Sequence, residues 1–188
     1  MSRLKKTGDW TEWQVRPIGR VRNKIEPQER PPQNSPLARK GQKWRNPASW
    51  GDVVSELVIH KRLAEGLDGI EGYSHILVYY WTGMKSETLP WSRRFRIKFH
   101  PAGREEFPLV GVFATRSPVR PNPICVTAVE LLKRRDNVLR VKGLDTFNGT
   151  PIIDIKPYLP YYDSVPDAKI AEWVSDLAKF LLTESTTT

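Results

Sequence analysis

The sequence contains a single cysteine, Cys125, among its 188 residues. One cysteine excludes an internal disulfide framework and any cysteine-rich zinc site. The three histidines, His60, His75 and His100, are far apart and lack the spacing of metal ligands. The sequence therefore predicts no bound metal, and its cysteine content fits a cytoplasmic protein.

Long apolar runs are also missing. The longest run, from Ile76 to Trp81, is far too short to span a bilayer. The first ten residues, MSRLKKTGDW, carry charge but no apolar core, so they do not have the form of a secretory signal. We therefore expect no membrane partner and a cytoplasmic location.

The motifs of several enzyme classes are absent as well. No G-x-G-x-x-G and no P-loop follows a predicted strand, which argues against a Rossmann nucleotide site or an NTPase. No G-x-S-x-G is present and Cys125 has no histidine beside it in sequence, so nothing supports classical nucleophilic hydrolysis.

Positive charge is abundant but unevenly distributed. The formal net charge is +9, and residues 1–50 hold 12 Lys or Arg against 4 Asp or Glu, a net of +8. The remaining 138 residues hold 18 basic and 17 acidic side chains, a net of +1. Such asymmetry favours a polyanionic partner, most commonly RNA or DNA. The alternative is a basic arm that only aids solubility.

Several stretches have the composition and alternation of β-strands. They are residues 13–22 (an edge strand because of Pro17), 53–59, 73–81, 93–98, 110–115, 124–132, 138–144 and 152–158. The stretch 73–81 is almost entirely apolar, which predicts a central buried strand with His75 as a hydrogen-bonded core residue. Residues 60–67 favour a short helix, and residues 23–50 a long polar loop.

The period of the sequence changes near its end. Apolar side chains at Ile170, Trp173, Val174, Leu177, Phe180 and Leu181 have helical spacing, which predicts an amphipathic helix between Pro166 and Leu182. Successive strands with little helix between them predict an all-β fold, an antiparallel β-barrel or sandwich, with this helix at its C-terminus. We divide the chain into a flexible tail (1–12), the β domain (13–163), and the helix with its tail (164–188).

The stretch Val110 to Asn122, VGVFATRSPVRPN, stands out. It begins as an apolar strand and turns into a loop in which prolines prevent both a helix and a central strand. Prolines also restrict the residues before them, so the loop should be stiff and should lose little entropy on binding a ligand. A second polar loop, Asp145 to Thr150, also follows an apolar strand. At one rim of a barrel, the two loops would converge on one pocket.

Four ordered motifs resemble the TsaA-like (TrmO-type) family. They read PIGRVR (residues 17–22), LDGIEGYSH (67–75), VGVFATRSPVRPNPI (110–124) and GLDTFNGTPIIDIKPYLP (143–160), and the resemblance covers roughly residues 15–163. It implies a β-barrel and a homodimeric enzyme that uses S-adenosylmethionine to methylate tRNA. The implied target is N6 of threonylcarbamoyladenosine beside the anticodon, at position 37.

The resemblance also implies which residues line the cofactor pocket. They are Pro32, Gln33, Asn34, Gly83, Met84, Arg116, Ile124, Asp145, Thr146, Phe147, Asn148, Gly149 and Thr150. The planar fork of Arg116 suits the cofactor carboxylate, and an Asn-Gly turn favours positive φ at Gly149. Two departures from the family are visible: Gly83 occupies a position that is commonly histidine, and the early loop reads RPPQNSP where Pro-Arg-Gln is more usual.

Methyl transfer from a sulfonium depends mainly on in-line positioning, because the leaving group departs neutral. A hydrogen-bond acceptor that orients or removes the N6 proton would assist. Asn122 and Asp154 are the catalytic candidates, with the alternative that Asp154 is a structural partner of Lys156.

The basic residues assigned to the RNA backbone are Arg39, Lys40, Lys43, Arg45, Arg93, Arg94, Arg96, Lys98 and Arg120. Two other functions stay open. One is a non-catalytic RNA-binding barrel, and the other is a methyltransferase with a different RNA or a small-molecule acceptor.

Overall fold

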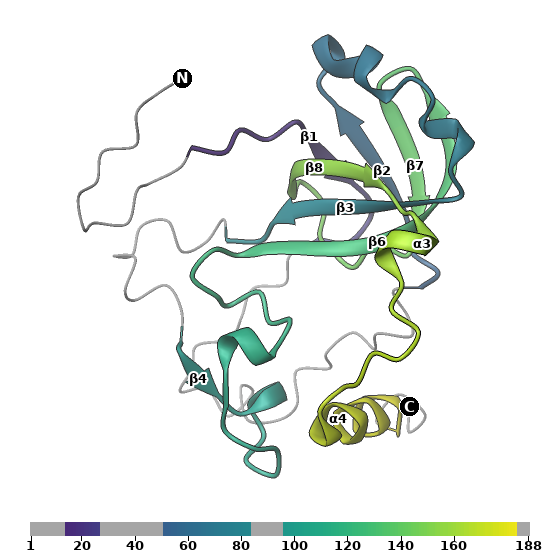
Figure 1. The fold of residues 1–188 in the computed structure, drawn as a ribbon. Helices are drawn as coiled ribbons and strands as arrows, with labels where there is room; N and C mark the ends of the chain where they lie inside the picture. The colour runs from purple at the N-terminus through teal and green to yellow at the C-terminus, as the bar shows by residue number, and fades with distance from the viewer. Residues whose placement is uncertain (1–13, 27–50, 84–95, 184–188) are drawn as a thin grey trace, which may run out of the picture.

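The computed structural model describes residues 14–26, 51–83 and 96–183 (Figure 1). Six strands close into an antiparallel barrel in the order β1-β2-β7-β6-β3-β8. Their bounds are β1 Gly19–Arg22, β2 Val54–Ile59, β3 His75–Trp81, β6 Ile124–Arg135, β7 Val138–Lys142 and β8 Pro151–Pro157. The predicted all-β barrel is confirmed.

Side-chain alternation along the strands fills the barrel. In β3 the residues Ile76, Val78 and Tyr80 point inward and are buried, whereas His75 at the start of the strand is exposed. The prediction of a core histidine was therefore wrong, because only every second residue of β3 faces the interior. The same alternation on the other strands supplies the rest of the core: Val21, Leu57, Ile59, Val129, Leu139, Val141 and Ile152.

The first strand is not an edge. β1 pairs with β2 on one side and with β8 on the other, and Pro17 lies before it. A Cβ at Gly19 would lie 2.4 Å from the carbonyl oxygen of Val58. Only glycine therefore permits β1 to approach β2 this closely.

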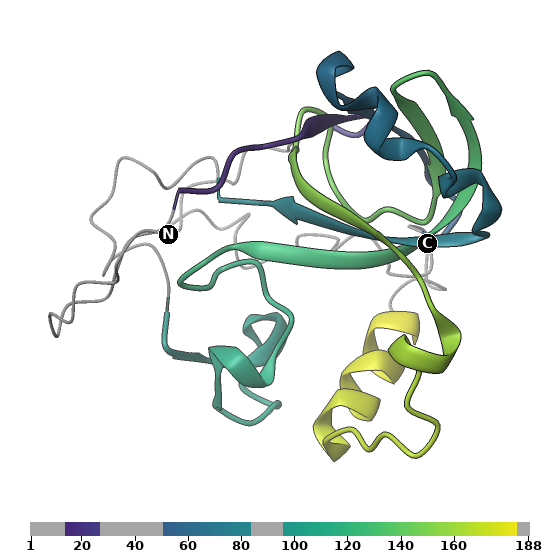
Figure 2. The ribbon, with the colours of Figure 1, turned by 45° about the horizontal axis from the view of Figure 1, so that its top comes forward.

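A two-stranded ribbon lies outside the barrel (Figures 1 and 2). It pairs β4 (Lys98–Phe99) with β5 (Val110–Gly111). The predicted strand over residues 110–115 was wrong beyond Gly111, because the chain turns into the 3-10 helix η5 (Val112–Ala114), where Phe113 is 78% exposed. Of the predicted strand over 93–98, residues 93–95 lie outside the described residues, and residues 96–97 are not in a strand, because β4 begins at Lys98.

The β6–β7 hairpin is longer than the sequence indicated. β6 continues to Arg135, and the chain reverses at Asp136, whose φ is 50°. The pairing of β6 with β7 begins only at Glu130. The first half of β6 therefore has β3 on one side and no β7 partner on the other, and the candidate site lies at this free edge.

The helices differ in detail from the prediction. Residues Lys61–Leu67 and Ile70–Gly72 form the 3-10 helices η1 and η2, and Pro101–Gly103 forms η4. A short helix α3 (Pro160–Asp163) follows β8, and α4 spans Glu172–Thr183. The C-terminal helix thus begins six residues after Pro166, and Ile170 lies before it, 67% exposed.

Helix α4 packs beside the ribbon rather than on the barrel (Figure 2). The rings of Phe180 and Phe107 meet edge to face at 5.9 Å, and the Arg104 guanidinium lies 4.1 Å from the Phe180 ring centroid. The predicted β domain, residues 13–163, therefore includes both the barrel and the ribbon region, and the ribbon region contacts α4.

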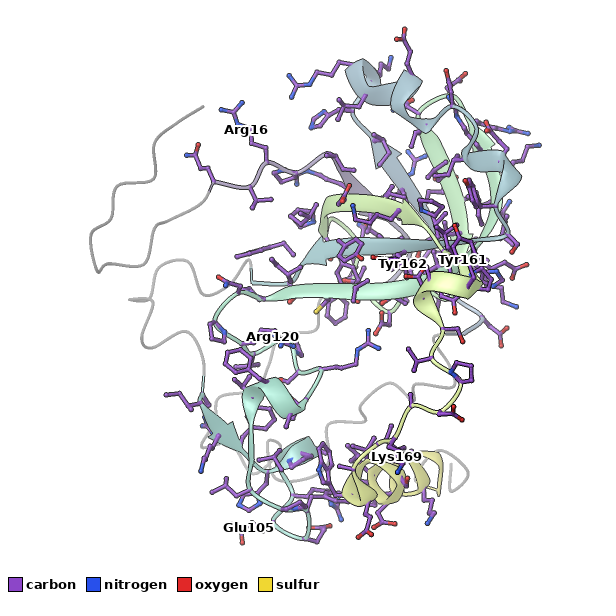
Figure 3. All side chains as sticks on the ribbon, in the orientation of Figure 1. Arg16, Glu105, Arg120, Tyr161, Tyr162 and Lys169 are labelled. Atoms are coloured by element: carbon purple, nitrogen blue, oxygen red, sulfur yellow. The ribbon has the colours of Figure 1, made fainter. Side chains whose placement is uncertain are left out.

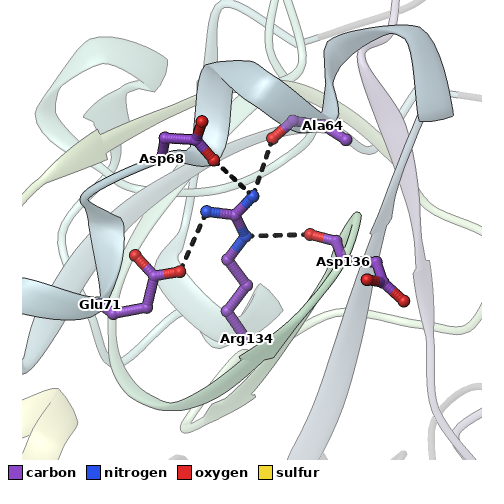
Figure 4. A network of polar contacts seen from close by, with 5 residues as sticks. All are labelled: Ala64, Asp68, Glu71, Arg134 and Asp136. Carbon is purple, nitrogen blue, oxygen red and sulfur yellow. Dashed lines mark hydrogen bonds and ion pairs between the residues drawn. The ribbon is translucent and has the colours of Figure 1, made fainter.

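Arg134 joins the hairpin to the 3-10 segment (Figure 4). Its guanidinium forms ion pairs with Asp68 (2.8 Å) and Glu71 (2.9 Å), and donates to the carbonyl oxygens of Ala64 and Asp136. The side chain is only 14% exposed. Backbone hydrogen bonding and Arg134 together lower the pKa of Glu71 below its ordinary value.

We expect Arg134→Ala to lower the melting temperature by several degrees, because four acceptors lose their shared donor. Glu71, with its lowered pKa, adds stability above its unfolded-state pKa and loses it as the pH falls. The difference between wild type and variant should therefore narrow below roughly pH 4. Thermal melts from pH 3 to 8 measure this, with Arg135→Ala, exposed and next in the same strand, as the matched control. Equal melting temperatures for the two variants at pH 7 would contradict it.

Within the described residues no helix has the length and apolarity needed to cross a membrane. The same residues contain no group of three or more His, Cys, Asp or Glu side chains arranged to hold a metal ion.

Candidate functional site

The loop from Thr115 to Asn122 is held in shape by its own side chains. The Thr115 hydroxyl donates to the carbonyl oxygen of Val112 (2.8 Å) and accepts from the Ser117 N–H (3.3 Å). The Ser117 hydroxyl accepts from the Val119 N–H (3.2 Å). Each of these hydroxyls accepts from the backbone N–H two residues later in the chain. Such bonds order the backbone where prolines prevent the hydrogen bonds of a regular strand. The loop is therefore ordered without being helix or strand.

This loop and the outer face of β6 enclose an open hollow of about 420 Å³. Its lining consists of Phe113, Arg120, Pro121, Asn122, Ile124 and Val126. Arg120 lies between β6 and the ribbon, and its guanidinium donates to the carbonyl oxygen of Thr115 (Figure 3). An aromatic ring, an amide and a guanidinium around one hollow suit a planar ligand with polar edges.

Arg116 attaches the loop to the free edge of β6. Its Nη2 donates to the carbonyl oxygen of Val126, in the half of β6 that β7 does not pair. Arg116 is otherwise exposed. Since a guanidinium carries five N–H donors, this contact leaves donors for a ligand carboxylate.

Asp145 lies on the other side of the same strand. Its Oδ1 accepts from the Tyr80 hydroxyl (2.8 Å) and from the Thr127 hydroxyl (2.5 Å). Tyr80 is buried at 3% exposure, whereas Asp145 is exposed. Burial, and after it the charge of Asp145, raises the pKa of Tyr80 well above its ordinary value.

The two loops contact neighbouring residues of β6, since Arg116 donates to the carbonyl oxygen of Val126 and Asp145 accepts from the Thr127 hydroxyl. The thiol of Cys125, two residues before Thr127, responds to charges of both loops. Burial raises the pKa of its thiol, the charge of Asp145 raises that pKa further, and the charges of Arg120 and Arg116 lower it. The sequence predicted that the two loops would converge at one rim of a barrel. In the structure Arg116 and Asp145 are bonded to adjacent residues of β6.

The rest of the Asp145–Thr150 loop faces elsewhere. Thr146 and Thr150 are buried and their hydroxyls lie 3.0 Å apart. Their carbonyl oxygens accept from the Asn23 amide and the Val21 N–H, so both residues hold the loop in place. Asn148 accepts from the Asn23 N–H and donates to Glu26. Gly149 has φ of +79°, as the Asn-Gly turn predicted.

Phe147 is 39% exposed, and Ile124 is 40% exposed beside the hollow. Gly83 has no space for a side chain, because a Cβ there would lie 2.5 Å from Cγ of Pro123. A histidine at this position would therefore displace the proline that precedes Ile124.

Asp154 lies in β8, paired in register with Tyr79. Its Oδ2 is 2.9 Å from the Lys156 ammonium, and its Oδ1 accepts from the Ile155 N–H. This is the structural ion pair that the sequence offered as the alternative. Of the two catalytic candidates, only Asn122 lines the hollow.

Three of the RNA-binding candidates are described: Arg96 and Lys98 are exposed on the ribbon, and Arg120 lines the hollow. The other site predictions lie outside the described residues. They are Pro32, Gln33, Asn34, Arg39, Lys40, Lys43, Arg45, Met84, Arg93 and Arg94.

Sequence reasoning missed Tyr80, Thr127 and Asn23. Asn23 donates its amide to the Ser55 hydroxyl and to the Thr146 carbonyl oxygen, both at 3.0 Å, and so fixes the second loop. For Tyr80 and Thr127 the sequence offered one indication. The alternation of strand residues turns both side chains towards the barrel interior, where a hydroxyl needs a hydrogen-bond partner.

Residues 33–164 match a family model described as the tRNA-methyltransferase O N-terminal domain. The chain belongs to this family. All the described members of the TrmO-type site, from Gly83 to Asp154, fall within the matched region.

Relatives extend the comparison. An S-adenosyl-L-methionine-binding protein of Archaeoglobus fulgidus is 43% identical over 116 residues, covering 62% of this chain and 77% of that protein. A probable S-adenosyl-L-methionine-binding protein of Methanothermobacter thermautotrophicus is 34% identical over 154 residues, covering 82% and 96%. The tRNA (adenine(37)-N6)-methyltransferase of Escherichia coli is 41% identical over 111 residues, covering 56% and 44%.

Crystal structures of TrmO, two of them from Pseudomonas aeruginosa, share the fold. Two of them align with TM-scores of 0.62 and 0.59 at 27% sequence identity. The chain spans 63% of these solved chains, 44% of the E. coli enzyme and 29% of a second Archaeoglobus fulgidus relative. It thus corresponds to the N-terminal part of the longer family members.

Proposed function

We propose that this chain is an S-adenosylmethionine-dependent methyltransferase that acts on tRNA. The observation that carries the proposal is that Arg116 and Asp145 contact adjacent residues of β6, Val126 and Thr127, within the region that matches the TrmO N-terminal domain. The activity of the E. coli relative supports N6 of adenosine 37 as the acceptor. We extend this to the threonylcarbamoylated form of that adenosine, which the family resemblance implies.

The charges at the site fit the cofactor. S-adenosylmethionine has a carboxylate, an ammonium and a ribose diol, and its sulfonium supplies an activated methyl group. The exposed guanidinium of Arg116 and the half-buried one of Arg120 can bind the carboxylate, and a carboxylate can accept from the ammonium or the diol. The site therefore holds the donor and acceptor types that this cofactor requires.

The chain's contribution to catalysis is mainly positioning. Asn122 stands between Pro121 and Pro123, so its backbone is restricted, and its side chain lines the hollow beside Phe113 and Arg120. The side-chain oxygen of an asparagine can accept a hydrogen bond from an exocyclic amine and orient its lone pair. Phe113, 78% exposed, offers a face for base stacking.

The proposal includes tRNA as partner, a homodimer and a cytoplasmic location. The basic N-terminal quarter supports an RNA partner. Exposed apolar side chains on and near the ribbon, at Ile97 (72%) and Leu109 (56%), are of the kind that a second chain can cover. The family resemblance supports the dimer and the location.

Calorimetry with S-adenosylmethionine tests the proposal directly. We expect binding without added metal, and Arg116→Ala should weaken it by about 1.5–3 kcal/mol, the range for a hydrogen bond to a charged group. Arg62→Ala, an exposed arginine on η1 at the far end of the barrel, is the matched control and should bind as wild type. Unchanged affinity in Arg116→Ala would remove Arg116 from the pocket, and absence of wild-type binding would favour a non-catalytic RNA-binding barrel.

A further inference from the structure

Three oxygen atoms form a compact triangle at the barrel mouth. The Tyr80 hydroxyl lies 2.8 Å from Asp145 Oδ1, the Thr127 hydroxyl lies 2.5 Å from the same atom, and the two hydroxyls are 3.1 Å apart. Both hydroxyls come from inward-facing positions, since Tyr80 pairs with Cys125 and Thr127 pairs with Val78.

The protons of this triangle can be assigned. An ionised carboxylate only accepts, so each hydroxyl donates its single proton to Oδ1. No proton is left for the 3.1 Å contact between the hydroxyls, which is therefore a consequence of their shared acceptor. Among the described residues, the structure shows no partner for Oδ2 of Asp145.

The two hydroxyls do not need Asp145 merely to have a hydrogen-bond partner. A hydroxyl at a barrel mouth can be satisfied by water. Here two hydroxyls fix a carboxylate that is itself exposed, which removes its rotational freedom before a ligand arrives. Thr127 is next in β6 to Val126, whose carbonyl oxygen accepts from Arg116, so the fixed carboxylate stands near a group assigned to the cofactor.

We propose that Tyr80 and Thr127 are positioning residues, which hold Asp145 so that its Oδ2 accepts a hydrogen bond from the bound cofactor. This inference rests on the proposed function and adds a role for two residues that bind no ligand themselves. The donor is an N–H or O–H group of S-adenosylmethionine, either the methionyl ammonium or the ribose diol.

The test measures cofactor affinity in variants that keep the core filled. Tyr80→Phe removes one hydroxyl and retains the ring, and we expect it to weaken S-adenosylmethionine binding by roughly tenfold, the lower end for a bond to a charged group. Thr127→Val should have a similar effect, whereas Thr127→Ser keeps the hydroxyl and should restore binding. In an Asp145→Asn background, Tyr80→Phe should cause little further loss, because its effect passes through Asp145.

Two adenosine ligands identify the donor. S-adenosylhomocysteine has the amino-acid end and the ribose, whereas 5′-methylthioadenosine has only the ribose. A Tyr80→Phe penalty for both ligands assigns the bond to the diol. A penalty for S-adenosylhomocysteine alone assigns it to the ammonium, and either result supports the inference.

Melting temperatures of all variants separate affinity from folding. Wild-type affinity in Tyr80→Phe and Thr127→Val overturns the positioning role, even if Asp145→Asn binds weakly. Equal losses from Tyr80→Phe with and without Asp145 also overturn it, because the hydroxyl would then act independently. A wild-type protein that binds no S-adenosylmethionine overturns the proposed function, and this inference with it.

Discussion

An Asn122→Ala variant is expected to methylate tRNA with a kcat/KM about 100-fold below wild type, the cost of a small misplacement of reacting groups. Asn122 lines the hollow beside Arg120 and Phe113, and prolines on both sides restrict its backbone. Alanine retains that backbone and removes the amide that orients the acceptor amine. Single-turnover transfer of labelled methyl groups from S-adenosylmethionine to tRNA measures the effect.

Asp154→Asn is the matched control for this variant. Its carboxylate is paired with Lys156 at 2.9 Å, so we expect kcat/KM within a few-fold of wild type. Cofactor affinity, measured by calorimetry, should stay close to wild type in both variants. A large loss in Asp154→Asn with little loss in Asn122→Ala would reverse the assignment and make Asp154 the catalytic residue.

The barrel could be predicted from the sequence because its strands alternate. Residues 54–59, 75–81 and 138–142 lie in strands in which every second residue is buried. Apolar side chains fill all of these positions in 75–81 and 138–142, and Ser55 occupies one of them in 54–59. Closure of the sheet was not visible locally, since it depends on the pairing of β1 with β8, residues more than a hundred positions apart.

The apolar stretch before the proline loop was misread for a physical reason. Val110 to Ala114 has the composition of a buried strand, but the chain has left the barrel there and pairs only with β4. The β propensity of a segment shows only that it can form a strand. Whether it does so depends on a neighbouring strand with which it can pair. Phe113 is consequently exposed beside the hollow, where a site can use it.

The polar loops of the site were identifiable because prolines and an Asn-Gly pair mark them in sequence. The support behind Asp145 was not, because Tyr80 and Thr127 meet only when the register of β3 against β6 is known. A shift of one strand by one residue would place the two hydroxyls on opposite faces of the sheet. Contacts between side chains on different strands therefore cannot be predicted from a local sequence motif.

Neutralising Arg39, Lys40, Lys43 and Arg45 together is expected to weaken tRNA binding strongly and to flatten its salt dependence. The first 50 residues hold +8 of the net +9 charge, and the cofactor is too small to require it. Each phosphate contact adds roughly 0.7–0.9 to the slope of log K against log salt, so loss of four contacts should lower that slope by about 3. Salt titrations of tRNA binding by wild type and quadruple variant measure it.

The matched control removes the same charge elsewhere. Lys61, Arg62, Lys169 and Lys179 are exposed on η1, before α4 and on α4, and their replacement by glutamine also lowers the net charge by four. We expect this variant to keep the wild-type salt slope, because these four side chains do not contact phosphates in our proposal. If only the net charge of the protein mattered, both variants would lower the slope equally. Cofactor affinity should be unchanged in both. Identical slopes for wild type and the N-terminal variant would make the basic quarter a solubilising arm, and would favour a small-molecule acceptor over tRNA.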